Sequence, residues 1–184
     1  MAWEFDQAHT VIGFSAKHMM VTTVRGKFTK FSGELDLNEE HPEQSTLSVT
    51  VDAASLTTGQ EQRDGHLRSP DFFDVANYPT ITFVSKKVEK KGEDRYHLLG
   101  DLTIRNVTRE VPLDVTLEGR GKTPDGTNIA GFTITGTISR KDFDLNWNVA
   151  LESGGWLVSD QVKLEIDAEV VESVPAPVEA QANA

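Results

Sequence analysis

Along most of the chain, apolar residues recur at every second position, the pattern of a strand with one buried face. The alternation is clearest between residues 162 and 170, where Val, Leu, Ile and Ala alternate with charged residues. Phe28 and Phe31 are out of phase with each other, so we expect a bulge between them. Trp3 and Phe5 could form a short edge strand. The pattern predicts eight main strands, within residues 11–20, 25–37, 47–53, 81–83, 98–104, 111–117, 132–138 and 162–170.

The alternation stops between residues 59 and 76, where apolar residues gather between charged ones. Residues 61–68 have helical character. Ser69 suits a helix N-cap, Pro70 suits the first helical position, and Asp71 suits the positive end of the helix dipole. We therefore predict a short helical insertion near residues 59–76, closing one mouth of a structure built from strands.

Eight alternating strands joined by short links indicate an all-β antiparallel sheet. Each strand has one apolar face, so the sheet must cover itself, either as a closed barrel or as a two-sheet sandwich. A barrel of about eight strands is filled by its own side chains or holds one small ligand. The long insertion with its own apolar residues favours a barrel with a lid, and the sandwich remains the alternative.

The length fits one domain, which we place at residues 1–172, followed by a disordered tail at 173–184 that is rich in Pro, Ala, Val and Glu. The formal net charge of −11 disfavours nucleic acid as a partner. No run of about 20 apolar residues occurs, so no stable membrane insertion is expected. The first residues lack a basic start and an apolar h-region. We expect a cytoplasmic protein, or a periplasmic one if a leader peptide has been removed.

The candidate chemical groups do not converge on a catalytic motif. The chain has no cysteine, its five histidines are scattered without ligand spacing, and no Gly-x-Ser-x-Gly elbow occurs. We therefore predict no catalytic residue, no metal site and no cofactor. His18 lies in phase with Phe14, so it is either a hydrogen-bonded core histidine or a polar anchor for a ligand. Arg63 and Asp64 are either contacts for a polar head group, together with Arg68, or a structural ion pair at the barrel rim.

A series of motifs in order resembles the YceI-like (polyisoprenoid-binding) proteins from about residue 3 to residue 172. The motifs are Trp3-Glu4-Phe5-Asp6, His9-Thr10, Phe14-Ser15-Ala16-Lys17-His18-Met19, Gly26-Lys27-Phe28, Arg63-Asp64-Gly65-His66-Leu67, Asp71-Phe72-Phe73-Asp74, Tyr78-Pro79, Gly100-Asp101-Leu102-Thr103-Ile104 and Gly131-Phe132. The resemblance implies an eight-stranded lipocalin-like barrel with an elongated apolar cavity. Asn106 and Asp144 stand where that family usually has glycine, and both residue types can occupy turns.

The resemblance implies that the chain binds, carries or stores a long-chain amphiphile such as an isoprenoid quinone or polyprenyl phosphate, without catalysis. From the alternation we expect an apolar lining with His18 and Arg63 as head-group contacts; the predicted ligand-binding residues are Phe14, His18, Met20, Arg63, Leu67, Phe72, Phe83, Leu102 and Phe132. Two other functions stay open. One is an enzyme acting on a small amphiphile through His18, His66 or Asp64, and the other is a filled barrel that serves as a stress-response interaction module. A homodimer also stays open.

Overall fold

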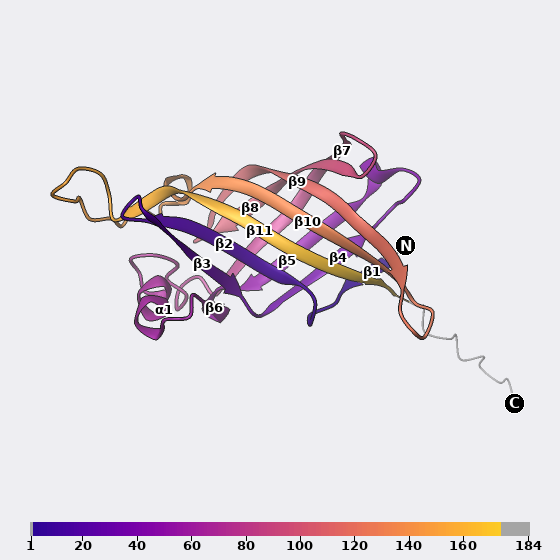
Figure 1. Cartoon of the computed structure of the whole chain (residues 1–184), viewed down its shortest axis with the longest axis horizontal. Helices are drawn as coiled ribbons and strands as arrows, with labels where there is room; N and C mark the ends of the chain where they lie inside the picture. The colour runs from indigo at the N-terminus through magenta and orange to yellow at the C-terminus, as the bar shows by residue number, and fades with distance from the viewer. Residues whose placement is uncertain (1, 174–184) are drawn as a thin grey trace, which may run out of the picture.

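The computed structural model describes residues 2–173 as an elongated barrel of strands with a short helix at one end (Figure 1). The helix is α1 (Glu61–Arg68), and three single turns of 3₁₀-helix are η1 (Pro42–Gln44), η2 (Ala53–Ser55) and η3 (Arg140–Phe143). The strands are β1 (Ala2–Phe5), β2 (Val11–His18), β3 (Thr22–Phe28), β4 (Phe31–Asp36), β5 (Thr46–Asp52), β6 (Leu56–Thr57), β7 (Thr80–Lys90), β8 (Arg95–Ile104), β9 (Val107–Lys122), β10 (Asn128–Ser139) and β11 (Val158–Glu172).

The sheet closes on itself as an antiparallel barrel of eight strand positions. Three of these positions are each built from two consecutive strands: β1 with β2, β3 with β4, and β5 with β6. β1 and β2 follow one another along the same edge of β11, with Phe5 opposite Val170 and Val11 opposite Asp167. On their other side, β1 pairs with β4 and β2 pairs with β3. The predicted all-β, eight-stranded barrel is confirmed, and the two-sheet sandwich does not form.

The interruption expected between Phe28 and Phe31 is where the second composite position changes its partner. β3 ends at Phe28, which pairs with Leu56 of β6, and β4 begins at Phe31, which pairs with Val51 of β5. The expectation that Trp3 and Phe5 form an edge strand is wrong. β1 has a partner on each side, and a closed barrel has no edge at this position.

The insertion contains one helix, and the predicted helix start at Ser69 is wrong. Ser69 is the C-cap of α1: its N–H donates to the His66 carbonyl at 3.1 Å, and its hydroxyl donates to the same oxygen at 2.6 Å. The residue before a proline is pushed out of helical geometry, so Ser69 before Pro70 marks an end rather than a beginning. The following residues form turns, the first closed by the Phe72 N–H on the Ser69 carbonyl at 3.0 Å.

Two turns carry the non-glycine residues that we expected to tolerate left-handed geometry. Asn106 joins β8 to β9 with a φ of 62°, and Asp144 follows η3 with a φ of 59°. Asn and Asp adopt this region at lower cost than most residues, which allows them to replace the usual glycine.

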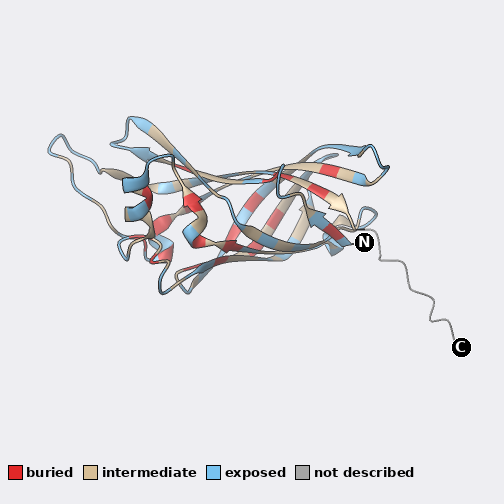
Figure 2. Cartoon of the chain, turned by 90° about the horizontal axis from the view of Figure 1, so that it is seen from below, coloured by how far each residue is buried: buried red, intermediate tan, exposed pale blue. Residues whose placement is uncertain are grey.

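Buried positions alternate with less buried ones along the strands and gather around α1 (Figure 2). A smaller buried cluster of Trp3, Ala130 and Val170 lies near the N-terminal end of the chain. Ser173, where the predicted tail begins, donates its N–H to the Ala2 carbonyl at 3.0 Å. The rest of the predicted tail, 174–184, lies outside the described residues.

Candidate ligand-binding cavity

The interior of the barrel contains an apolar cavity of about 330 Å³. It extends from Leu67 and Phe72, at the end covered by α1, to Leu37 and Pro42, in the link between β4 and β5. This volume lies within the range of about 300–1,000 Å³ that small-molecule sites occupy. The barrel is therefore hollow in part, and its interior is not completely filled by side chains.

Aromatic rings form much of the cavity wall. All nine phenylalanines line it except Phe143, which is fully buried behind the wall. Two of the rings lie flat against glycines of neighbouring strands: a Cβ built on Gly26 would lie 2.4 Å from Cζ of Phe14, and one built on Gly100 would lie 2.3 Å from Cζ of Phe83. The absence of a side chain at these glycines lets the rings lie against the wall and leaves the centre of the barrel open.

At one end of the cavity, α1 and the turns after it form a cap held by hydrogen bonds. Arg68 donates to the carbonyls of Ala54 and Leu56 at 2.9 and 2.7 Å, and Arg105 donates to the Phe72 carbonyl at 3.0 Å. The Phe72 ring contacts His66 and Trp147, with centroid separations of 5.1 and 5.4 Å. These hydrogen bonds and ring contacts close this end of the cavity, and both arginines are already hydrogen-bonded to backbone carbonyls of the protein.

Asp64 is a buried acid on α1, and its carboxylate accepts hydrogen bonds from Thr58. The Asp64 carboxylate accepts from the backbone N–H of Thr58 at 2.8 Å and from its hydroxyl at 2.6 Å. Burial works to raise the pKa of Asp64, but these hydrogen bonds and the nearby charge of Arg68 lower it below the ordinary value. Arg63 donates through Nε to the same Thr58 hydroxyl at 2.6 Å and through Nη2 to the Thr58 carbonyl at 3.0 Å. Arg63 and Asp64 thus fix the cap through their shared partner Thr58.

The opposite end of the cavity carries a group of polar residues. They belong to the link between β4 and β5, to the start of β5 and to the end of β9: Asn38, Glu39, Ser45, Thr46 and Arg120. Arg120 donates to the Glu39 carboxylate, and both side chains are about half exposed, at 47% and 46%. This end offers a cation and hydroxyl groups beside an apolar interior, which is the arrangement that fits an amphiphile with a polar head.

The structure separates the predicted ligand-binding residues into two groups. The first lines the cavity: Phe14, Leu67, Phe72, Phe83, Leu102 and Phe132. Their role in binding stays a prediction. The second group, His18, Met20 and Arg63, lies outside the cavity lining, and His18 and Met20 are exposed, so the expectation that these three residues line the cavity is wrong. His18 is the last residue of β2, at the end of the strand. Met19 and Met20 form the next turn with φ values of 51° and 62°, so the alternation ends at His18 and does not reach Met20.

The residues considered for acid–base catalysis are not brought together around the cavity. His18 is exposed at the end of β2, Asp64 accepts its bonds from Thr58, and Nε2 of His66 lies 2.9 Å from the Asp71 carboxylate. None of these three residues is part of the cavity lining. General acid–base catalysis needs such groups within reach of one reacting atom, and the geometry does not supply that arrangement here.

Sequence reasoning missed the polar end of the cavity. Arg120 and Glu39 are 81 residues apart, and no motif links them. A signal was present all the same: in a barrel of antiparallel strands, successive links alternate between the two ends. Counting links from the predicted strands places 38–44 and 118–131 at the same end, and the helical insertion at the other.

The comparisons with known proteins agree with this geometry. A family model described as the YceI-like domain matches residues 3–170. The chain belongs to the YceI-like family. A UPF0312 protein of Staphylococcus aureus (strain MSSA476) is 40% identical over 168 residues, which cover 90% of this chain and 94% of that protein.

Solved structures of other proteins superpose on this barrel. The YCEI protein of Campylobacter jejuni superposes with a TM-score of 0.76 at 33% identity, covering 86% of this chain and 90% of that one. A polyisoprenoid binding domain from Saccharophagus degradans superposes with a TM-score of 0.67, covering 93% and 98%; at 16% identity this likeness shows the fold. The helices of residues 2–173 include none with the length and apolar character that crossing a membrane requires.

Proposed function

We propose that this YceI-like protein binds a long-chain amphiphilic lipid, such as an isoprenoid quinone or polyprenyl phosphate, and carries or stores it without catalysis. The observation that carries the proposal is the apolar cavity inside a closed barrel, with a group of five polar lining residues, Asn38, Glu39, Ser45, Thr46 and Arg120, at the end away from α1. Membership of the YceI-like family and the fold shared with a polyisoprenoid binding domain support lipid or isoprenoid binding in general.

The apolar lining supplies the driving force for this binding. Each 100 Å² of lipid tail removed from water contributes roughly 2.5 kcal/mol at about 25 cal/mol per Å². Burying roughly 400 Å² therefore contributes about 10 kcal/mol, from which association and ordering remove several kcal/mol. The polar end then sets the direction of the ligand: the tail lies among the phenylalanines, and the head group lies beside Arg120.

Extraction of the purified full chain with organic solvent, followed by mass spectrometry, tests the proposal, together with loading by a polyprenyl phosphate. Ile134 lines the cavity, whereas the next residue, Thr135, is exposed and lies outside it. We expect Ile134→Trp to reduce loading strongly, because the indole occupies the interior, and Thr135→Trp to load like the unmodified protein. Absence of any extracted or loaded long-chain molecule, or equal loading of the two variants, contradicts the proposal.

The head-group assignment has a separate test. We expect Arg120→Gln to weaken binding of a polyprenyl phosphate by up to about fivefold, the equivalent of about 1 kcal/mol for a half-exposed ion pair. Binding of the uncharged polyprenol should stay unchanged. The matched control is Arg109→Gln, since Arg109 is an exposed arginine of the same strand and lies outside the cavity lining. Equal effects on phosphate and alcohol would remove Arg120 from the head-group site.

A further inference from the structure

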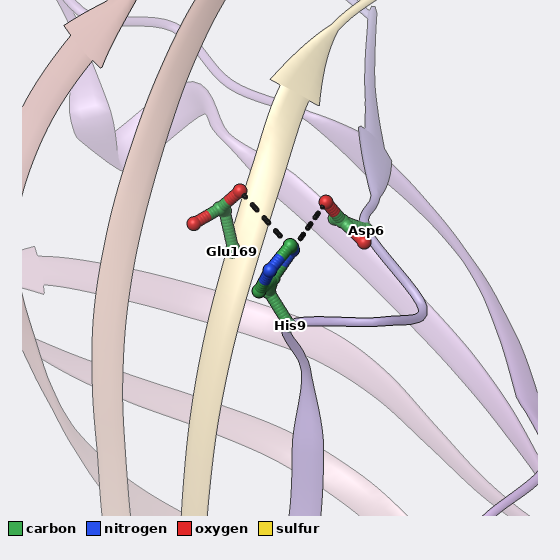
Figure 3. Close-up of side chains that lie close together, drawn as sticks. All are labelled: Asp6, His9 and Glu169. Carbon is green, nitrogen blue, oxygen red and sulfur yellow. Dashed lines mark hydrogen bonds and ion pairs between the residues drawn. The ribbon is translucent and has the colours of Figure 1, made fainter. Parts of the chain in front are cut away.

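A cluster of three side chains with metal-ligand chemistry lies on the outer surface of the barrel, near the junction of β1 and β2. Figure 3 shows Asp6 and His9, from the loop between these strands, facing Glu169 of β11. Nδ1 of His9 lies 2.8 Å from Oδ2 of Asp6 and 3.8 Å from Oε1 of Glu169. The inward residues Ala168 and Val170 line the cavity on either side of Glu169, so the Glu169 side chain points away from the proposed lipid site.

The backbone holds the two segments of this cluster together independently of the three side chains. The Asp6 N–H donates to the Glu169 carbonyl at 2.9 Å. The buried Thr10 hydroxyl accepts from the Glu169 N–H at 3.1 Å and donates to the Glu169 carbonyl at 3.2 Å. Asp6 is oriented further by the Ala8 N–H, which donates to Oδ1 at 2.8 Å and leaves Oδ2 facing His9. The three side chains therefore start from anchored backbone positions.

The spacing of the three groups fits a metal ion. One ligand atom from each residue lies within 4.8 Å of the other two. Ligand atoms around a tetrahedral Zn²⁺, with bonds of about 2.0–2.2 Å, are about 3.4 Å apart. The distances of 2.8 and 3.8 Å from Nδ1 bracket that value, so movements of about half an ångström by the exposed His9 and the partly exposed Asp6 and Glu169 side chains bring both into range. On β10, Gly131 lies opposite Glu169, and no atom lies within 4 Å of where its Cβ would be, which leaves space for a coordinating water.

We propose that Asp6, His9 and Glu169 form a surface site for a divalent transition-metal ion, with water completing its coordination. One imidazole and two carboxylates suit Zn²⁺, Co²⁺ or Ni²⁺, whereas Ca²⁺ and Mg²⁺ prefer oxygen ligands alone. The chain has no cysteine, so no thiolate competes for such an ion. A bound ion joins the loop between β1 and β2 to β11, at the position where the barrel closes.

Titration of the full chain with Zn²⁺ in a calorimeter, at about pH 8, above the ordinary imidazole pKa of about 6.5, tests the proposal. Co²⁺, whose visible absorption reports nitrogen and oxygen coordination, is the second probe. We expect one strong site per chain. His9→Gln should weaken binding by at least tenfold, and so should Glu169→Gln, which keeps the backbone bonds to Thr10 and Asp6. Circular dichroism establishes that each variant is folded.

His41 provides a matched control. Its Nδ1 lies 3.3 Å from one carboxylate, that of Glu43, and its side chain is 59% exposed, against 66% for His9. His41→Gln should bind Zn²⁺ like the unmodified protein. No binding at millimolar Zn²⁺, or unchanged binding in both His9→Gln and Glu169→Gln, overturns the proposal. Because the cluster lies on the outer face, either result leaves the lipid proposal to its own tests.

Discussion

Replacing Gly26 by alanine should push an aromatic ring into the lipid cavity. The new Cβ would lie 2.4 Å from Cζ of Phe14 and 2.9 Å from Cε1 and Cε2, while ordinary contact begins near 3.4 Å. The ring must therefore move by about 1 Å, and it is the moving group because the close atoms all belong to this side chain. Overpacking of this kind costs about 1–3 kcal/mol, and the displaced ring narrows the cavity.

A double-mutant cycle with Phe14→Ala measures this effect by urea unfolding. We expect Gly26→Ala to lower the free energy of unfolding by about 1–3 kcal/mol in the unmodified protein and to cost almost nothing once Phe14 is alanine. Loading with polyprenyl phosphate should fall in Gly26→Ala and recover in the double variant. Gly119→Ala is the control, since no atom lies within 4 Å of the Cβ that it adds. Equal costs of Gly26→Ala in both backgrounds would refute the argument that Phe14 lies against the wall because of this glycine.

Three further predictions concern the cap and a turn. Thr58→Val removes the hydroxyl shared by Asp64 and Arg63, and it should lower the free energy of unfolding by about 1–3 kcal/mol, measured in urea against Thr50→Val on the exposed part of β5. The folded-state pKa of Asp64 is lowered, so its ionised form stabilises the protein above the unfolded pKa near 3.8 and this contribution is lost as the pH falls through the folded value. The stability difference between the unmodified protein and Asp64→Asn should therefore be large at about pH 6 and shrink at about pH 3; a constant difference would contradict this. Asp144→Gly should raise the free energy of unfolding by up to about 1 kcal/mol, measured as a slightly higher melting temperature, because Asp144 has a φ of 59° and glycine adopts this geometry without strain. A lower melting temperature would contradict this account of the turn.

Hydrophobic alternation was sufficient to predict the barrel wall. The period-two pattern places Phe14, Phe83, Leu102 and Phe132 on the inner face of their strands, and all four line the cavity. The pattern failed where backbone geometry changes without a change in residue type. Methionine rarely adopts positive φ, so nothing in the spacing of Met19 and Met20 revealed a turn there.

The pairing of β1 with strands on both sides was also beyond the sequence pattern. β1 has four residues, too few for alternation to distinguish an edge strand from one with two partners. Its partners are residues 35–36 of β4 and 170–172 of β11, and such long-range pairing leaves no local trace. The contact of Trp147 with Phe72 was missed for the same reason: residues 142–159 have no regular period, and only the link count places them beside the cap.

The two ends of the cavity differ in how firmly their arginines are held, and this difference sets the direction of the proposed ligand. Arg140 lines the cavity near α1, but it is only 3% exposed and donates to the carbonyls of Leu145 and Trp147 at 2.7 and 2.8 Å. An anion that took Arg140 would leave these carbonyls without their donor, at about 1–3 kcal/mol for each buried group. Arg120 at the other end has a half-exposed carboxylate partner, and exchanging a surface ion pair for another costs at most about 1 kcal/mol. An anionic head group therefore gains a cation at the Arg120 end and disrupts the structure at the α1 end, so we expect the tail to point toward α1.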